Sequence, residues 1–244
     1  MSFRFARRLA LVFAIGLSAS LAAAERLPLP ANLVDLASPD GERMFYESGP
    51  LQAYFPLSAQ FVTQKTQAYC GVASMTMVLN ALGAPAPASQ EYQPYRVFTQ
   101  DNLLDAATDA VLPRDVVARQ GMTLDQLGAL LALRAASEVR HAADGGLEAF
   151  RADARAALGA GDRFVLVNYL RSALGQQAGG HISPLAAYDE KTDRFLILDV
   201  ARYKYPSVWV TASDLFAAMN RIDPVSGTTR GYALVSAKPA AAAQ

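Results

Sequence analysis

The chain has 244 residues, of which 52% are apolar and 18% charged, so it can bury a substantial core and is neither disordered nor collagen-like. Its 22 basic and 22 acidic residues balance and form no block of like charge, which argues against a nucleic-acid partner. The single cysteine, Cys70, excludes an intramolecular disulfide and a metal-responsive cysteine cluster within this sequence.

The first 24 residues have the pattern of a secretory signal peptide. Three arginines within the first eight residues precede an apolar run over residues 9–21, and three alanines follow and end at Ala24. The apolar run is shorter than the ~20 residues that a membrane-spanning helix needs. We therefore expect cleavage after Ala24, a mature protein of residues 25–244 that forms one catalytic domain in the periplasm or outside the cell, and no stable membrane association.

The first half of the mature sequence is predicted to be mostly helical. Residues 25–60 contain scattered Pro, Ser and Gly and are expected to form an extended arm without regular elements. After Cys70, apolar residues recur at steps of three and four, which predicts an amphipathic helix over residues 70–82. Further helices are predicted over residues 99–110, 123–136 and 146–158.

The second half changes to short runs of β-branched and aromatic residues separated by turn residues. These runs predict strands over residues 163–170, 181–188, 194–200, 207–210 and 230–235, with a short helix over residues 211–220. Helices followed by an antiparallel sheet indicate an α+β fold in one domain.

Cys70 lies at the predicted start of a helix, where unpaired backbone N–H groups and the helix dipole lower the pKa of a thiol. Gly71 leaves the approach to the sulfur open, and the Cys70 N–H is placed to donate to an oxyanion formed on an attacked carbonyl. On this feature alone, a small buried hydrophobic residue is the alternative interpretation.

The sequence contains two histidines, and only one is placed for catalysis. His141 lies in a polar stretch that is expected to be a solvated loop. His181 follows two glycines and begins an apolar strand, and Asp199 ends the strand that returns antiparallel to it. Counting through the turn places Asp199 within about three residues of His181 across the ladder, with a bulge at the glycines able to complete the alignment. The alternative is that His181 caps a strand and Asp199 binds turn amides.

Cys70, His181 and Asp199 together fit a cysteine–histidine–acid mechanism, in which the imidazole takes the thiol proton and the carboxylate orients the ring. Gln64, six residues before Cys70, is a candidate side-chain donor to the oxyanion hole. The chain order Gln, Cys, His, acid is that of papain-like enzymes, with Asp in place of the usual Asn.

Three blocks of sequence resemble the catalytic domain of the phytochelatin synthase family. They are the run from Gln64 to Leu82, which contains Tyr-Cys-Gly-Val-Ala-Ser, the Gly-His-Ile-Ser-Pro run from Gly180 to Tyr188, and the run from Leu198 to Pro206. The resemblance implies a papain-like fold with the nucleophile at a helix N-terminus, packed on a C-terminal antiparallel sheet. It also implies that Gln64, Cys70, His181 and Asp199 occupy the oxyanion, nucleophile, base and orienting positions.

The activity implied by the resemblance is γ-glutamylcysteine dipeptidyl transfer from glutathione. Cys70 attacks the Cys–Gly peptide bond, glycine leaves, and the acyl-enzyme passes the dipeptide to another glutathione or to water. With one cysteine, the sequence resembles the short bacterial members, and we expect hydrolysis to compete with transfer.

Glutathione carries an ammonium and a carboxylate at its γ-glutamyl end, so its site needs a cation and an anion close together. The candidates at predicted strand ends are Arg171, Arg230 and Asp223, and Arg202 follows Asp199 closely. The alternative for each is a solvated turn residue.

No intrinsic cofactor and no protein metal site are expected, although cadmium or zinc thiolates of glutathione are candidate co-substrates. The expected partners are glutathione and related γ-glutamyl thiol peptides, and a homodimer is left open. Two other functions remain: a papain-like peptidase that cleaves peptide leaders, and a non-catalytic protein in which Cys70 and His181 bind a thiol or a soft metal ion.

Overall fold

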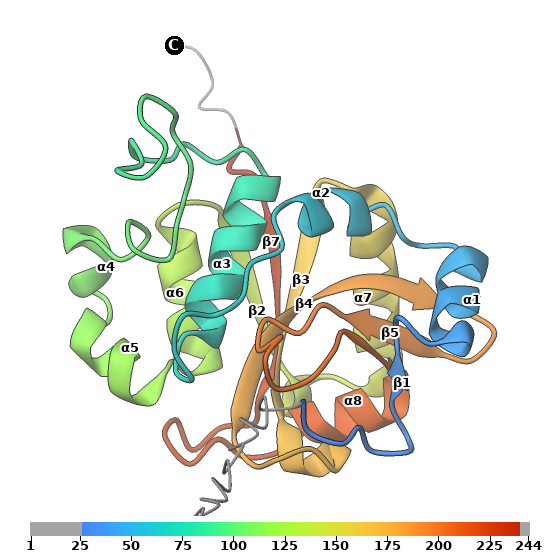
Figure 1. The fold of residues 1–244 in the computed structure, drawn as a ribbon. Coiled ribbons are helices and arrows are strands. Elements are labelled where there is room, and N and C mark those ends of the chain that lie inside the picture. The colour runs from blue at the N-terminus through green and yellow to red at the C-terminus, as the bar shows by residue number, and fades with distance from the viewer. Residues whose placement is uncertain (1–25, 240–244) are drawn as a thin grey trace, which may run out of the picture.

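The computed structural model describes residues 26–239 (Figure 1), so the predicted signal peptide lies outside the described residues. Its centre is a seven-stranded antiparallel sheet with strand order β1-β6-β5-β4-β3-β7-β2. The strands are β1 (Val34–Asp35), β2 (Ala136–His141), β3 (Arg163–Leu170), β4 (Gly180–Asp189), β5 (Arg194–Ile197), β6 (Val208–Thr211) and β7 (Gly231–Ser236).

Eight α-helices and two 3₁₀ turns surround this sheet within the described residues. They are α1 (Pro39–Glu47), α2 (Tyr54–Ala59), α3 (Cys70–Ala81), α4 (Ala106–Asp109), α5 (Arg114–Gln120), α6 (Leu124–Ala132), α7 (Leu147–Ala160) and α8 (Ala212–Met219), with η1 (Ala142–Asp144) and η2 (Arg171–Leu174). The prediction of a mixed helical and antiparallel α+β fold is confirmed.

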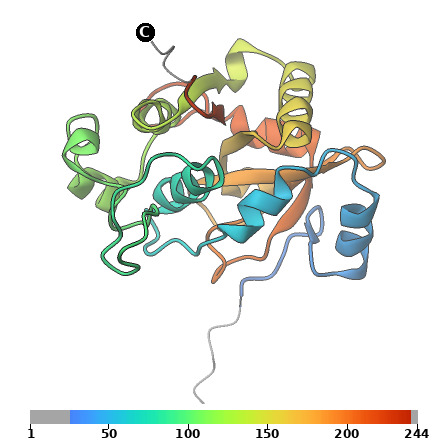
Figure 2. The same cartoon turned by 90° about the horizontal axis from the view of Figure 1, so that it is seen from above.

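Helices cover both faces of the central strands. Helix α3 packs on β4, while α7 and α8 pack on β3 from the opposite side of the sheet (Figure 2). Every residue of β4 after Gly180 is therefore buried, including the polar residues His181, Ser183 and Asp189. The packing of α3 on β4 places the first turn of α3 directly against the start of β4.

Helix α3 forms where the sequence predicted it, and its N-terminal residue is Cys70. The helix lacks a polar face because nearly its whole length is buried, with Asn80 and Ala81 at its end the less buried positions. Tyr69 precedes it and offers no side-chain cap. The backbone N–H groups of the first turn are thus left for other acceptors.

Several predicted elements were wrong. The segment 25–60 is not an irregular arm: it contains β1, α1 and α2, and Ser38 caps α1 through the Gly41 N–H. The predicted helix over residues 99–110 is reduced to the single turn of α4, and α5 was missed. The predicted helix over residues 123–136 ends early, because the chain turns at Leu133 into strand β2.

The polar stretch of residues 139–144, expected to be a solvated loop, forms the end of strand β2 and the η1 turn. The side chains of β2 alternate between half-buried and exposed, as on an edge strand, and the strand pairs with β7 along its full length. Residues 26–239 include no helix with the length and apolar character needed to cross a membrane.

Candidate active site

Cys70 lies at the junction of α3 and β4, with 8% of its surface exposed. Burial raises the pKa of its thiol, but the hydrogen bond and the charge of His181 outweigh burial, with further help from the N–H groups of Ile182 and Gly71. The net pKa of Cys70 therefore lies below its ordinary value. Cys70 is the first residue of α3, and its role as the nucleophile stays a prediction.

His181 connects the thiol to a buried carboxylate. Its Nε2 atom lies 2.9 Å from Asp199 Oδ1 and 2.9 Å from Ser183 Oγ. Because these two groups engage Nε2, Nδ1 is the ring nitrogen left to face Cys70. The ring edge packs against Tyr169 with 5.7 Å between ring centroids, which further fixes its plane.

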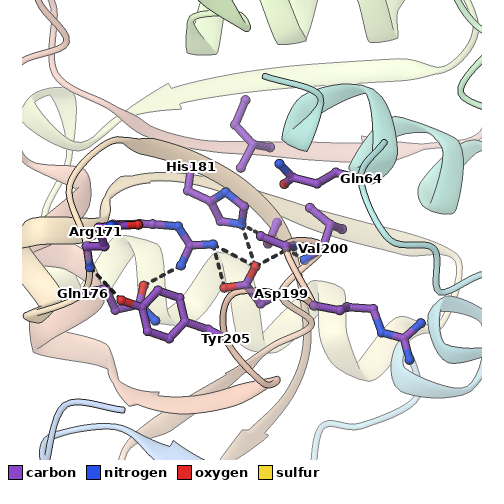
Figure 3. Close-up of polar contacts among 12 residues, drawn as sticks. Gln64, Arg171, Gln176, His181, Asp199, Val200 and Tyr205 are labelled. Carbon is purple, nitrogen blue, oxygen red and sulfur yellow. Dashed lines mark hydrogen bonds and ion pairs between the residues drawn. The ribbon is translucent and has the colours of Figure 1, made fainter. Parts of the chain in front are cut away.

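Asp199 is completely buried and accepts several hydrogen bonds (Figure 3). Arg171 Nη2 donates to both of its carboxylate oxygens at 2.9 and 2.8 Å, and the Ala201 N–H donates to Oδ1 at 2.8 Å. Burial raises the pKa of Asp199, but the charge and hydrogen bond of His181 and the charge of Arg171 outweigh burial and lower the pKa to about 2. Asp199 is therefore ionised across the neutral pH range.

The predicted pairing of His181 with Asp199 across the hairpin is confirmed, but the bulge that aligns them lies elsewhere. The register of β4 and β5 shifts between Leu185 and Ala187, not at the glycines before His181. Beyond β5, the Leu198 N–H donates to the Pro184 carbonyl and carries Asp199 on toward His181.

The pKa of His181 shifts in the opposite direction to that of Cys70. Burial lowers the pKa of His181, but the charge of Asp199 outweighs it and raises the net pKa above its ordinary value. The pKa of Cys70 thus moves down and that of His181 moves up, and both shifts are in the direction that favours a thiolate beside an imidazolium. A thiolate is the nucleophilic form of cysteine.

A cavity of about 250 Å³ opens beside Cys70 and His181. Its wall on the sheet side contains Asn168 of β3, together with Asp223 and Arg230 from the hairpin before β7. The Arg230 Nη1 atom lies 2.9 Å from Asp223 Oδ2 and donates to Asn168 Oδ1 at 2.9 Å. A cation and an anion predicted from the sequence thus lie together at the wall of the cavity that contains the thiol.

Gly180 makes room for this arginine. A Cβ atom at position 180 would lie 2.6 Å from Arg230 Nη1, so a larger residue would displace the guanidinium. Two buried nitrogens of this cluster, Asn168 Nδ2 and Arg230 Nε, have no hydrogen-bond partner among the described residues. Both atoms are hydrogen-bond donors, and the surrounding protein covers them in this structure.

Arg171 and Arg202 do not line this cavity, contrary to the expectation that they hold substrate. Arg171 is 3% exposed and is used inside the protein: Asp199 and Gln176 accept from its guanidinium, and the Tyr205 ring lies 5.2 Å below it. The short η2 turn after β3 returns Arg171 into the core, where a solvent-facing strand end was expected. Arg202 is exposed and stacks over Phe61 at 4.7 Å, beside a different surface cleft.

Gln64 is buried near His181 (Figure 3), and its backbone N–H donates to the Val200 carbonyl. Its Nε2 atom donates to the Thr66 carbonyl at 2.7 Å and to the Tyr203 hydroxyl at 3.1 Å, and Oε1 has no partner among the described residues. The role of Gln64 as an oxyanion donor stays a prediction, since both amide hydrogens have acceptors here.

Sequence reasoning missed the residues that support the triad and the cavity. Ser183 lies two residues after His181, so its side chain shares a face of β4 with the imidazole, a signal that strand alternation carries. Asn168 faces Ile182 across the β3–β4 ladder and is a polar residue within an apolar strand. Gln176 and Tyr205 have no comparable signal, because only the folded loops bring them to Arg171.

A thiol at a helix start, an imidazole beside it and a buried carboxylate behind the imidazole make up a cysteine–histidine–aspartate triad of the kind used in acyl transfer. Residues 24–232 match the family model described as phytochelatin synthase, and the chain belongs to this family. The resemblance carried by the three sequence blocks is thus confirmed.

Named relatives agree with this assignment. Glutathione gamma-glutamylcysteinyltransferase 3 of Lotus japonicus is 37% identical over 214 residues, which cover 86% of this chain and 43% of that protein. Glutathione gamma-glutamylcysteinyltransferase 1 of Arabidopsis thaliana is 33% identical, with the same coverage of 86% and 43%. The enzyme of that name in Schizosaccharomyces pombe is 30% identical over 85% of this chain and 50% of its own length. The chain therefore spans half the length of these relatives or less.

Proposed function

We propose that this protein is a cysteine-dependent γ-glutamylcysteine transferase and hydrolase that acts on glutathione, built on a papain-like fold. One observation carries the proposal: the cavity that contains Cys70 and His181 also contains the Asp223–Arg230 pair at its wall. Glutathione presents a carboxylate, an ammonium and a scissile peptide bond on one small molecule. The names of the relatives describe the same transferase reaction on glutathione.

In the first half-reaction, the Cys70 thiolate attacks the carbonyl carbon of the Cys–Gly peptide bond. The carbonyl electron pair moves to oxygen, and the Cys70 N–H at the start of α3 donates to this oxyanion. As the tetrahedral intermediate collapses, the His181 imidazolium gives its proton to the glycine nitrogen and glycine leaves. The product is a thioester between γ-glutamylcysteine and Cys70, with His181 neutral.

In the second half-reaction, His181 takes a proton from the acceptor, which is water or the amino group of a second glutathione. The acceptor attacks the thioester, the Cys70 thiolate leaves, and the imidazolium is restored. Asp199 stays ionised throughout and stabilises the imidazolium through its 2.9 Å contact with Nε2. Water gives γ-glutamylcysteine, and glutathione gives a longer thiol peptide.

The γ-glutamyl end is held by the cluster at the cavity wall. Arg230 Nε and Asn168 Nδ2, both buried and without partners among the described residues, are donors for the γ-glutamyl α-carboxylate. The carboxylate of Asp223 is the acceptor for the ammonium. Arg171 is assigned to Asp199 in this proposal and takes no part in holding substrate.

We further propose that the protein is exported by its first 24 residues and acts in the periplasm or outside the cell, without an intrinsic cofactor. Cadmium or zinc thiolates of glutathione are proposed co-substrates, with detoxification of heavy metals as the corresponding role. Export is supported by the charge and hydropathy pattern of the N-terminal segment alone.

The test is to incubate the purified protein with glutathione and measure glycine, γ-glutamylcysteine and longer γ-glutamyl peptides by mass spectrometry. We expect stoichiometric glycine and γ-glutamylcysteine at low glutathione, and longer peptides as glutathione rises, with and without added cadmium or zinc. Glycine release without any γ-glutamylcysteine product, or no glycine release under any condition, would contradict the proposal. Cleavage of unrelated peptides but not glutathione would support the leader-peptidase alternative.

Replacing Gln64 with alanine is expected to lower kcat for glycine release by about 10²–10³ with KM little changed, if its amide donates to the oxyanion. Tyr203→Phe is the matched comparison, because it removes the hydroxyl that Nε2 contacts and frees an N–H hydrogen without removing the amide. Its kcat should stay near that of the parent. A Gln64→Ala loss that lies wholly in KM would assign the amide to ground-state substrate binding.

A further inference from the structure

His141 is half-buried between two parts of the chain that line the active-site cavity. Its Nδ1 atom lies 2.5 Å from the Thr229 carbonyl oxygen, and its Nε2 atom lies 2.9 Å from Asp125 Oδ1. The His141 side chain is 17% exposed, although the sequence suggested a solvated loop. The two contacts span the cavity side of the protein from α6 to the start of β7.

Both partners of His141 are hydrogen-bond acceptors. A carbonyl oxygen has no proton to donate, and neither has an ionised carboxylate. A neutral imidazole carries one N–H group and can satisfy only one of them, whereas an imidazolium donates to both. The geometry is therefore that of a protonated histidine.

The Thr229 contact lies at the base of a hairpin that presents substrate-binding residues. Residues 221–230 form this hairpin, with the Asp223 N–H donating to Thr228 and the Arg230 N–H to Arg221. Asp223 and Arg230 both line the cavity. The two residues after His141 continue the connection, since the Ala142 N–H donates to the Arg230 carbonyl and the Ala143 N–H to Thr229 Oγ1.

The Asp125 contact joins His141 to a second part of the cavity wall, the start of α6. Thr123 and Gln126 line the cavity, and they close a capping box in which each side chain binds the other's backbone N–H. Asp125 lies in this same first turn of α6. His141 is therefore a cross-link between the first turn of α6 and the hairpin that carries Arg230.

Other charged groups around His141 are largely paired with one another. The titratable and charged side chains near it are Arg140, Asp144, Asp153, Tyr232 and Asp125. Arg140 pairs with Glu138, and the Tyr232 hydroxyl donates to Asp153 at 2.7 Å. Asp125 and Asp144 remain as the carboxylates that favour a positive charge on His141.

We propose that His141 is a positioning residue which, as an imidazolium, holds the hairpin of residues 221–230 against α6 and so sets Arg230 for the γ-glutamyl carboxylate. The inference rests on the proposed function only in the role it gives to Arg230. It predicts that glutathione binding depends on a proton that takes no part in the chemistry at Cys70.

The sign of the pH dependence follows from the contacts. Burial lowers the pKa of His141, but the hydrogen bonds that His141 donates to the Thr229 carbonyl and the Asp125 carboxylate outweigh burial and raise the pKa above its ordinary value. The cross-link is therefore complete at a pH below the ordinary histidine pKa, and its stabilisation is lost as the pH rises through the raised value.

The chain offers a clean test because it has two histidines in all. In the untagged full chain carrying Cys70→Ser, ¹H–¹³C NMR gives one ring Cε1–H signal for each of the two histidines. The signal that is absent in His141→Gln belongs to His141. We expect His141 to titrate above the ordinary value and Asp125→Asn to lower its midpoint. The control is Asp40→Asn, which removes an equally exposed ion-paired carboxylate on α1 and should leave the midpoint unchanged. A His141 midpoint at or below the ordinary value would overturn the proposal.

Binding is measured by calorimetry of the same Cys70→Ser chain with glutathione across pH. We expect the dissociation constant to rise severalfold as His141 loses its proton, and His141→Gln to show the weaker value at every pH. When Arg230→Lys is already present, His141→Gln should raise the dissociation constant little further, because His141 acts through Arg230. An equal fold-loss in both backgrounds would overturn the assignment to Arg230.

Failure of the proposed function gives a different pattern. If no variant binds glutathione, the substrate assignment fails, and the backbone amide signal of Arg230 then tests the cross-link by itself. In the parent, the Arg230 amide signal should shift with pH at the same midpoint as His141. In His141→Gln this pH transition should be absent. In Asp125→Asn the midpoint of the transition should move to lower pH. If the pH dependence of the Arg230 amide signal is the same in the parent, in His141→Gln and in Asp125→Asn, the cross-link is overturned.

Discussion

Replacing Cys70 with serine is expected to abolish glycine release from glutathione, with a loss of at least about 10⁴-fold in kcat. The protein lowers the pKa of a thiol by placing it at the start of α3 beside His181. A serine hydroxyl starts from a far higher pKa, so the same imidazole leaves it protonated and poorly nucleophilic. Steady-state glycine release, measured with a coupled assay or by mass spectrometry, checks this.

The serine variant should keep its fold and its affinity for glutathione, because the Asp223–Arg230 pair and the rest of the cavity wall do not depend on the sulfur. Calorimetric binding with an unchanged melting temperature is therefore the control. His181→Ala should lose nearly as much activity, and Asp199→Asn should lose less, since the carboxylate only orients and stabilises the imidazolium. Measurable turnover by the serine variant would remove Cys70 from the nucleophile position.

The triad could be predicted because local patterns determine it. Apolar spacing after Cys70 fixes α3, and a helix that begins at a cysteine places the sulfur at its N-terminus. The short turn between β4 and β5 fixes which residues oppose each other, so Asp199 had to fall near His181. Only the position of the bulge was wrong, since the register of a sheet depends on packing against both of its faces.

The supporting residues could not be predicted because they depend on loops. Arg171 follows an apolar strand, and a charged residue there is ordinarily solvated. Whether it turns outward or inward depends on the η2 turn and on an acceptor 28 positions away in sequence, Asp199. The same holds for His141, whose acceptors lie 16 and 88 positions away.

Strand β2 also could not be predicted from its own residues. An edge strand needs only one apolar face, and the sequence Ala-Ser-Glu-Val-Arg-His offers few apolar residues to set a period of two. Its place in the sheet comes from pairing with β7, which begins about ninety positions later. A polar edge strand of this kind carries little local signal, so the sequence alone favours a loop at its polar end.

Arg171→Met is expected to lower the free energy of unfolding at neutral pH by about 3–5 kcal/mol, because it leaves the buried Asp199 carboxylate without one of its two cationic partners. Asp199 is fully buried and Arg171 is 3% exposed, so solvent replaces little of the lost interaction. Urea unfolding followed by fluorescence measures the change. The control is Arg202→Met, an exposed arginine over Phe61, which should cost no more than about 1 kcal/mol.

The loss has a defined pH dependence. The pKa of Asp199 is about 2 in the folded protein, below the value of about 3.9 for a free aspartate, so its stabilisation is complete above pH 4 or so and is lost as the pH falls toward 2. Without Arg171 the folded pKa of Asp199 rises toward the free value, and that stabilisation shrinks at neutral pH. The difference in stability between parent and Arg171→Met should therefore narrow as the pH falls below about 4.

Adding Asp199→Asn to Arg171→Met separates stability from catalysis. The double variant no longer buries an unpaired carboxylate, so part of the lost unfolding free energy should return, and the two substitutions should be less than additive. Glycine release by the double variant should not exceed that of Asp199→Asn alone, because an amide does not stabilise the His181 imidazolium as a carboxylate does. Strictly additive losses would mean that Arg171 stabilises the protein through Gln176 and Tyr205 rather than through Asp199.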